Sequence, residues 1–357
     1  VVSPWNYPFN LTFGPMIWSI AAGNTVIIKP SEMTPNMSAV IADIVERAFR
    51  PEEVSLFQGE ADVASYLTAL PFDHIFFTGS PAVGKHVMAA AAKNLTSVTL
   101  ELGGKSPVIV DKSVNIKKAV QSIAWGKFSN NGQTCIAPDY LYVHESVKDQ
   151  FVSELTACVE KQYGLGTNAK DNGDYCKVVN TSHYNRINRL LDDAKSKGGK
   201  LITGGQIDVA GRFIAPTLIE GMASDSAIME EEIFGPLLPV ITFSNIEEVI
   251  DVVNSKPKPL ALYIYSTDKR NIDKVLCETS AGDTCVNQTM MHFLHHNLPF
   301  GGVNNSGIGK SGGVWGFNAF THERSVLNDK FSSASLLHPP YTPKVRKLIK
   351  MAIKMTT

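Results

Sequence analysis

The amino-acid sequence predicts an α/β fold, with helices covering both faces of mainly parallel sheets. Short β-branched segments alternate with amphipathic segments along most of the chain. The segment 25–29 (TVIIK) is apolar on both faces, as a buried parallel strand is. The length of 357 residues exceeds what one compact core usually holds, so we expect two domains.

The first hundred residues predict an alternating set of strands and helices. The opening VVSPW is typical of the end of a strand, so we expect a preceding segment to be missing. A proline is tolerated in the first turn of a helix, which fits Pro81. The expected strands are 25–29, 54–57, 74–78 and 98–102, and the expected helices are 37–49, 62–70 and 81–92.

A second alternating set follows the pair Gly103-Gly104, which we interpret as a hinge between two halves. From Leu298 onward the glycine-rich sequence LPFGGVNNSGIGKSGG predicts a long ordered loop. The expected strands are 107–110, 140–143, 237–243, 261–265 and 282–286, and the expected helices are 115–125, 147–162, 183–195, 246–254 and 269–279.

Composition and charge narrow the classes of function. The net charge of −1 gives no general attraction to nucleic acid or to an anionic membrane. The hydrophobic content of 44% and charged content of 19% are those of a soluble globular protein. The five cysteines lack metal-ligand spacing and are odd in number, which favours a reducing, cytoplasmic compartment.

Cys135 is the strongest candidate for a reactive group. It follows the small, polar run 129–132 and precedes Pro138, so it lies on a loop ahead of a strand. A thiol on such a loop can act as a nucleophile if its surroundings favour the thiolate. The alternative is an inert, buried cysteine.

Two strand ends carry candidate anion and ribose ligands. Gly79 and Ser80 stand where a strand turns into a helix, and a helix N-terminus favours a phosphate. Lys29 and Glu32 follow another strand end and could reach ribose hydroxyls. The alternatives are an ordinary turn for the first pair and solvated surface charges for the second.

Three further segments carry polar groups suited to catalysis. Glu101 ends a strand beside the suspected hinge, where burial would raise its pKa and make it a general base. Asn6 offers an amide for an oxyanion, although Asn and Pro also mark turns. The acidic run that ends at Glu232 precedes the turn FGP, and by itself it reads as a solvated helix end.

The C-terminal tail predicts a basic amphipathic helix. Its apolar side chains share one helical face, and Lys and Arg occupy the other. Docking on the protein's own body or on a partner subunit is the commoner role of such a helix, and peripheral membrane contact is the alternative. The apolar positions are Val345, Leu348, Ile349, Ala352 and Ile353.

Together the motifs resemble the aldehyde dehydrogenase superfamily. PWNYP, IIKPSE, FTGS, ELGGKSP, NNGQTC, EEIFGP and PFGG occur in that order along nearly the whole chain. The sequences CIAPDYL and HPPY are most similar to the class 3 or fatty-aldehyde-type branch. The family carries further residues before PWNYP, which matches the expected missing segment.

The resemblance implies a fold and its domains. It implies a Rossmann-type NAD(P)-binding domain over residues 1–103 and an α/β catalytic domain over 104–297, both three-layer αβα sandwiches. Residues 298–357 would form a C-terminal return and tail.

The resemblance also implies roles for the candidate residues. Cys135 would be the nucleophile, Asn6 would stabilise the oxyanion with the Cys135 N–H, and Glu101 would activate water. The cofactor-binding set would be Trp5, Lys29, Glu32, Gly79, Ser80, Glu232 and Phe234. No metal is required.

The implied function is oxidation of an aldehyde, medium- or long-chain aliphatic or aromatic, to a carboxylic acid by a homodimer. Glu32 should disfavour a 2′-phosphate and so favour NAD, with NADP as the alternative cofactor. Tyr7, Met16 and Phe293 are candidates for lining the substrate entrance. The rival functions are a CoA-acylating dehydrogenase and a catalytically inactive binding or structural homologue.

Overall fold

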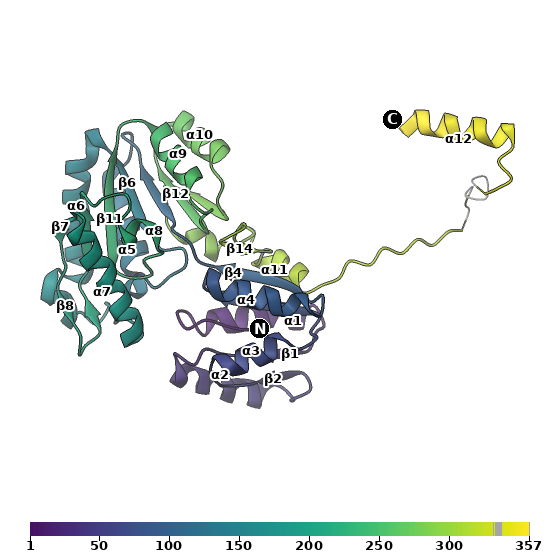
Figure 1. Ribbon diagram of the computed structural model, residues 1–357, viewed down its shortest axis with the longest axis horizontal. Helices are drawn as coiled ribbons and strands as arrows, with labels where there is room; N and C mark the ends of the chain where they lie inside the picture. The colour runs from purple at the N-terminus through teal and green to yellow at the C-terminus, as the bar shows by residue number, and fades with distance from the viewer. Residues whose placement is uncertain (331, 333–337, 357) are drawn as a thin grey trace. The chain divides into compact units, whose positions relative to one another are not determined.

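The chain folds into two units, Val1–Thr321 and His322–Thr357, in the computed structural model shown in Figure 1. The structure describes residues 1–330, 332 and 338–356. Each unit is considered by itself. The first unit carries every residue predicted to take part in catalysis or cofactor binding.

The larger sheet of the first unit has seven strands within the described residues, in the order β13-β12-β5-β6-β11-β10-β7. The strands pair in parallel, except that β7 is antiparallel to β10. The strands are β5 (Pro107–Val110), β6 (Tyr140–His144), β7 (Lys200–Thr203), β10 (Thr217–Glu220), β11 (Leu237–Phe243), β12 (Ala261–Tyr265) and β13 (Asp283–Val286).

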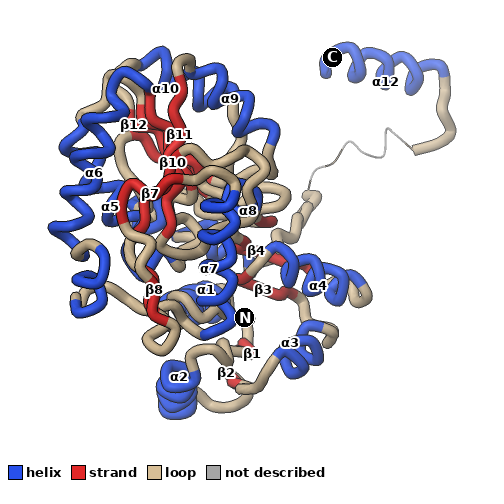
Figure 2. The backbone as a smooth tube through the Cα atoms, turned by 60° about the vertical axis from the view of Figure 1, so that its left-hand side comes forward, coloured by secondary structure: helices blue, strands red, loops and turns tan. Residues whose placement is uncertain are grey.

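Helices cover both faces of this sheet, as Figure 2 shows. Val108 and Val110 pack with side chains of α5 and α6, whereas the intervening Ile109 packs with side chains of α7, α9 and α10. This alternation is what a strand buried on both faces requires. The helices are α5 (Ile116–Phe128), α6 (Lys148–Tyr163), α7 (Thr181–Ser196), α8 (Ala227–Glu230), α9 (Ile246–Ser255) and α10 (Lys269–Glu278).

The N-terminal part of the unit is built on parallel strands joined by Val2. Val2 forms isolated parallel bridges to both Lys29 and Phe77, without a strand at the opening residues themselves. The strands are β1 (Val26–Ile28), β2 (Val54–Leu56), β3 (His74–Gly79) and β4 (Ser97–Leu102), and the helices are α1 (Asn10–Ala21), α2 (Pro35–Ala48), α3 (Ala61–Thr68) and α4 (Pro81–Ala92).

The glycine-rich segment after Leu298 is only partly a loop, so that prediction was wrong in one place. Strand β14 (Gly307–Ile308) pairs antiparallel with β4 and brings Gly307 beside Glu101. Two residues carry no periodicity, so the strand has no signal in the sequence. The remaining short elements are η1 (Ser129–Gly132), η2 (Glu145–Val147), η3 (Gly166–Asp171), β8 (Ile207–Asp208), β9 (Phe213–Ile214), η4 (Met291–Leu294) and α11 (Gly313–Ala319).

The second unit contains α12 (Pro343–Thr356), which confirms the helix predicted for the tail. In the part of the chain that the structure describes, no helix is both long and apolar enough to cross a membrane. The five cysteines are free thiols.

Ile109 gives a direct test of the sheet core, because its side chain is fully buried in the middle of β5. Ile109→Ala should lower the free energy of unfolding by about 2–5 kcal/mol, since a cavity adds to the lost burial. Ile109→Val, the matched control, should cost about 0.5–1.5 kcal/mol. Urea unfolding measures both, and equal costs would contradict this packing.

Candidate active site

Cys135 lies on a tightly bent loop between α5 and β6. Three consecutive residues, Asn130, Asn131 and Gly132, have left-handed backbones with φ of 49°, 58° and 71°. Asn and Gly are the residues that adopt this conformation most readily. A Cβ on Gly132 would lie 2.4 Å from the carbonyl oxygen of Gly235, so the glycine also permits a close backbone contact.

A neighbouring segment holds the loop in place. The Asn131 amide donates to the Cys176 carbonyl at 2.9 Å. The Gln133 side chain donates to the Lys177 carbonyl at 3.2 Å and accepts from the Val179 N–H at 2.9 Å. These bonds explain why the motif needs amide side chains at the positions before the cysteine.

Asn6 and Tyr7 approach the same loop from the N-terminal part of the chain. The Asn6 Nδ2 donates to the Gln133 carbonyl at 3.1 Å, and the Asn130 amide donates to the Asn6 carbonyl at 3.0 Å. The Tyr7 hydroxyl lies 2.9 Å from Thr134 Oγ1. The structure therefore brings both Asn6 and Tyr7 against the loop that carries Cys135.

Met16 does not lie in such a place. It is buried in the core cluster that Ile28, Ile41 and Val45 form between helices and β1. Its role as an entrance residue was wrong, because α1 turns this side chain toward the sheet. Phe293 is partly exposed and packs edge-on against Phe300, with ring centroids 5.0 Å apart.

Glu101 is buried at the end of β4 with one oxygen unpaired. Its Oε1 accepts from the Ser311 hydroxyl at 2.8 Å, and its Oε2 has no hydrogen-bond partner among the described residues. Burial raises the pKa of Glu101 to about 8, with a smaller contribution from Asp283, while Ser311 opposes the shift. Such a carboxyl group changes protonation state near neutral pH.

The Cys135 thiol lies within electrostatic reach of two buried carboxyl groups. Burial, followed by the charges of Glu232 and Glu101, raises the pKa of this thiol to about 12. The thiol is therefore protonated at neutral pH. It needs a base or an incoming positive charge before it can act as a nucleophile.

A buried ion pair anchors the segment that carries Glu232 and Phe234. The ammonium group of Lys105 pairs with the Asp139 carboxylate, and the two side chains are only 10% and 4% exposed. Lys105 also donates to the carbonyls of Ile228 and Glu231, each at 2.8 Å. The other Asp139 oxygen accepts from the Ile233 N–H at 2.8 Å.

Glu232 and Phe234 are fixed from the opposite side by α7. Arg186 donates to the carbonyls of Glu232 and Ile233 at 3.0 and 2.6 Å. The Glu232 carboxyl group lies against Gly103, where a Cβ would come within 2.3 Å of it. Burial, followed by the Asp139 charge, raises the pKa of Glu232 to about 8.

Phe234 presents its ring to Trp5. Its backbone is left-handed, with φ of 44°, which is uncommon for a bulky residue and implies local strain. The Phe234 and Trp5 rings meet edge to face, 5.4 Å between centroids. The two aromatic residues predicted to lie near the cofactor therefore do lie together.

Two residues of this region went unnoticed in the sequence. The ring centroids of His183 and Trp5 lie 5.1 Å apart, and the buried Nδ1 of His183 has no hydrogen-bond partner in the part of the chain that the structure describes. Lys127 is 1% exposed, and burial lowers its pKa to about 8. Neither residue belongs to one of the sequence motifs described above. Only the fold brings them into this region.

The remaining cofactor candidates lie after β1 and β3. The parallel bridges of Val2 place the carboxyl ends of both strands at one edge of the sheet, where ligands of such sheets bind. Lys29 is buried and its Nζ lies 2.6 Å from the Glu32 carboxylate, which is partly exposed. Burial opposes ionisation of Glu32, but the hydrogen bond from Lys29, a backbone hydrogen bond and the Lys29 charge together lower its pKa.

Gly79 and Ser80 form the turn into α4. Ser80 caps this helix by accepting from the Val83 N–H at 3.3 Å. A Cβ on Gly79 would lie 2.5 Å from the Phe77 ring, so packing as well as ligand access requires the glycine. The exposed N-terminus of α4 is suited to an anion.

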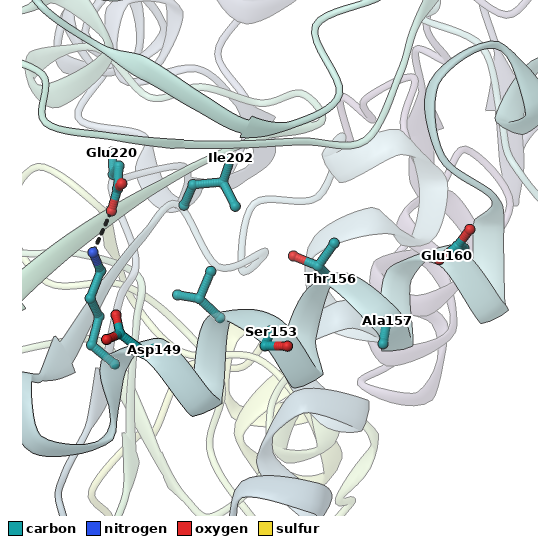
Figure 3. A pocket seen from close by; sticks show the side chains of 9 residues that line it. Asp149, Ser153, Thr156, Ala157, Glu160, Ile202 and Glu220 are labelled. Carbon is teal, nitrogen blue, oxygen red and sulfur yellow. Dashed lines mark ion pairs between the residues drawn. The ribbon is translucent and has the colours of Figure 1, made fainter.

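A separate groove lies between α6 and the sheet edge, shown in Figure 3. The ion pair between Lys148 and Glu220, at 2.6 Å, crosses one end of it. None of the predicted site residues lines it. The lining residues are Lys148, Asp149, Val152, Ser153, Thr156, Ala157, Glu160, Ile202 and Glu220.

Comparison with known proteins identifies the family. Residues 1–326 match the Aldehyde dehydrogenase family. The chain belongs to this family. It is 46% identical over 347 residues to 4,4'-diaponeurosporen-aldehyde dehydrogenase of Staphylococcus aureus, covering 97% of this chain and 74% of that protein. A solved structure described as the substrate-bound state of Staphylococcus aureus AldH superposes with a TM-score of 0.92 at 45% identity, covering 98% and 76% of the two chains.

Two mammalian relatives confirm the predicted branch. Aldehyde dehydrogenase family 3 member A2 of Rattus norvegicus is 42% identical over 343 residues, covering 96% of this chain and 69% of that protein. The dimeric NADP-preferring aldehyde dehydrogenase of Canis lupus familiaris is 41% identical over 348 residues, covering 98% and 75%. The protein is therefore an oxidoreductase of the aldehyde dehydrogenase family with class 3 relatives, and its fold is the α/β fold that was predicted.

The contribution of the buried Lys105–Asp139 pair to stability can be tested by replacing Lys105 while Asp139 is kept. Lys105→Met should lower the free energy of unfolding by about 3–5 kcal/mol, because the Asp139 carboxylate stays buried without a counter-charge. Lys105→Met with Asp139→Asn should recover much of this loss, since the amide oxygen can still accept from Ile233.

The matched control is the surface pair of Lys170 and Asp208, whose side chains are 49% and 30% exposed. Lys170→Met should cost less than about 1 kcal/mol. Thermal or urea unfolding compares the variants. Similar costs at Lys105 and Lys170 would mean that the buried pair does not anchor the segment.

Proposed function

We propose that the protein oxidises aldehydes to carboxylic acids with a nicotinamide cofactor and that Cys135 is the nucleophile. The observation that carries the proposal is the meeting of three parts of the chain at this thiol. The loop before Cys135 is bonded to Asn6, and the thiol interacts electrostatically with Glu101 and Glu232.

Attack of the Cys135 thiolate on the aldehyde carbon forms a C–S bond and leaves negative charge on the former carbonyl oxygen. Asn6 would stabilise that charge. One N–H of its amide is used on the Gln133 carbonyl, and the second is available to the oxyanion together with the Cys135 N–H. The bond to Gln133 fixes the amide before substrate arrives.

Glu101 is suited to the role of general base. Its buried Oε2 is free of hydrogen bonds within the described residues, and its pKa of about 8 lets it accept a proton from water. Water deprotonated in this way would hydrolyse the thioester on Cys135 and release the acid. A base in this position favours hydrolysis over transfer to CoA.

The N-terminal part of the chain, with the boundary near residue 103, would bind NAD(P). Lys29 and Glu32 would hold the adenosine ribose, Gly79 and Ser80 the pyrophosphate, and Glu232 the nicotinamide ribose. Phe234 would pack beside the nicotinamide, and Trp5 would lie close by. Support comes from His183 next to Trp5, whose buried Nδ1 has no hydrogen-bond partner among the described residues and could bond to a polar ligand. When bound, the cofactor accepts the hydride of the oxidation.

Cofactor and substrate preference follow from the same residues. The carboxylate of Glu32 repels a 2′-phosphate, so NAD is the preferred cofactor, although the canine relative is named NADP-preferring. The substrate is an apolar aldehyde, of medium or long chain or aromatic; the Staphylococcus relative is named for 4,4'-diaponeurosporen-aldehyde. The active form is a homodimer, as in the relative named dimeric.

Cys135→Ala should abolish aldehyde-dependent NADH formation, because no other thiol has this environment. Absorbance at the NADH band, followed over aldehydes of increasing chain length, measures activity and substrate class together. Cys277→Ala on the exposed face of α10 is the matched control and should keep parental activity. NADH formation by Cys135→Ala at the parental rate would refute the proposal.

The raised pKa of Glu101 predicts the direction in which turnover changes with pH. Its pKa is raised, so the carboxylate form gains population as pH rises through about 8, and turnover should rise over the same range. Glu101→Gln should form the acyl-enzyme in a burst and then stall, losing about 10²–10⁴-fold in steady turnover. Quenched-flow bursts and pH–rate profiles test this; full turnover with an unchanged profile would exclude Glu101 as the base.

A further inference from the structure

The chain segment 300–311 holds the backbone of Glu101 from one side. Its strand β14 lies against β4 (Figure 1), and Gly307 pairs with Glu101 in antiparallel register. The Leu102 N–H donates to the Ser306 carbonyl at 3.1 Å. Strand β3 pairs along the other edge of β4, so the backbone around Glu101 is bonded on both sides. The direction in which the Glu101 side chain leaves the sheet is therefore fixed.

The same segment then turns and brings Ser311 to the Glu101 carboxyl group. Ser311 and Phe300 form an antiparallel bridge, in which the Ser311 N–H donates to the Phe300 carbonyl at 2.6 Å and the Phe300 N–H donates to the Ser311 carbonyl at 2.9 Å. Ser311 and Glu101 are only 4% and 7% exposed. A buried backbone bridge therefore positions the Ser311 hydroxyl.

The Ser311 hydroxyl has two acceptors within reach but only one hydrogen to donate. Its Oγ lies 2.8 Å from Glu101 Oε1 and 3.3 Å from the carbonyl oxygen of Phe300. The Phe300 carbonyl already accepts from the Ser311 N–H. A hydrogen bond to an ionised carboxylate is shorter and about twice as strong as one to a neutral acceptor. The hydroxyl therefore donates to Oε1 when Glu101 is ionised.

This bond makes the two carboxylate oxygens of Glu101 unequal. Ser311 occupies Oε1, whereas Oε2 is buried and has no hydrogen-bond partner in the described part of the chain. The last side-chain torsion of a glutamate is otherwise broad, and rotation about it would exchange the two oxygens. With this rotation restrained, the unbonded oxygen keeps a constant position.

Titratable groups on other elements also face Glu101. Burial has the largest effect on the Glu101 pKa and raises it, and the Ser311 hydrogen bond comes next and lowers it. Smaller effects come from Asp283 of β13, which raises the pKa, and from Lys310, which lowers it. Negative charge on Glu101 in turn acts on the Cys135 thiol. Loss of the Ser311 hydroxyl should therefore change Glu101 more than loss of either charge.

We propose that Ser311 is a positioning residue for thioester hydrolysis, because its hydroxyl holds Oε1 of Glu101 so that Oε2 takes the proton from water. The proposal rests on the proposed role of Glu101 as general base. As Oε2 accepts the proton, the water oxygen bonds to the thioester carbon, the C–S bond breaks, and its electron pair leaves with the Cys135 sulfur. Ser311 acts only through Glu101, so formation of the thioester does not depend on it.

The first test measures the protonation of Glu101 in the resting protein and needs no turnover. Infrared difference spectra follow the carboxyl C=O band against pH, and Glu101→Gln identifies the band. Ser311→Ala should raise the midpoint by about one pH unit, since a bond that favours the ionised form is lost. Ser311→Thr keeps the hydroxyl and should titrate like the parent. An unchanged midpoint in Ser311→Ala would overturn the proposal.

The second test compares the burst and the steady state over pH. Ser311→Ala should keep the parental burst of NADH but lose about tenfold in steady turnover near neutral pH, because the rising limb of its profile moves to higher pH by about one unit. Ser311→Thr should recover most of the loss. A shifted infrared midpoint together with a parental turnover profile would exclude the positioning role.

Ser306→Ala is the matched control, because Ser306 is a buried serine of the same segment whose hydroxyl bonds to the Val303 backbone. It should keep the parental burst and pH midpoint even where its thermal stability falls. A Ser311→Ala protein that loses stability to the same extent and keeps the parental pH profile would leave Ser311 a structural role only and overturn the proposal. Failure of the proposed function gives a different result, since the parent then forms no NADH from aldehyde while the infrared titration still reports on the Ser311 bond.

Discussion

The candidate active site depends on one buried ion pair, between Lys105 in the ELGGKSP motif and Asp139 immediately before β6. Both partners also bond to the backbone of residues 228–233. The Lys105 ammonium donates to two carbonyls, and the Asp139 carboxylate accepts from one N–H. Charged groups are expensive to bury, and this pair is retained because its extra bonds satisfy both charges. The ion pair therefore fixes the position of this backbone segment. The position of the segment that carries Glu232 and Phe234 is determined by residues near the ends of two strands rather than by the segment's own sequence.

Burial also supplies the chemistry. The same exclusion of water raises the pKa of Glu101, of Glu232 and of the Cys135 thiol. The raised pKa values of the carboxyl groups work against ionisation of the thiol, because a protonated carboxyl group cannot accept the thiol proton. Only the carboxylate form can accept it. The carboxyl groups of Glu101 and Glu232 therefore change protonation state near neutral pH. Deprotonation of either carboxyl group makes ionisation of the Cys135 thiol more costly, because both negative charges act on it.

The sequence could predict the layered fold and most of its elements, because buried strands and amphipathic helices carry strong periodicity. Helix α4 and strands β5, β11 and β12 have the predicted bounds. It could not predict β14, whose two residues are ordered only by pairing with β4. Met16 was misplaced for a related reason, since the direction of a side chain depends on how α1 packs. Motif residues such as Asn6 and Glu101 were found, whereas His183 and Lys127 gain their surroundings only from tertiary contacts.

The two motifs that meet at the site are coupled through backbone as well as through side chains. Gly132, three residues before Cys135, packs against the carbonyl of Gly235, directly after Phe234. No side chain fits between them, so the separation of the nucleophile loop from the Phe234 segment is set by two polypeptide backbones in contact. Rotamer changes cannot alter that separation. The strained, left-handed conformations of Asn130, Asn131 and Phe234 lie on either side of this contact, and the ion pair and the Arg186 bonds hold the Phe234 segment against the loop. Strain of this kind persists only where the surroundings over-determine it, and here they fix the position of the thiol.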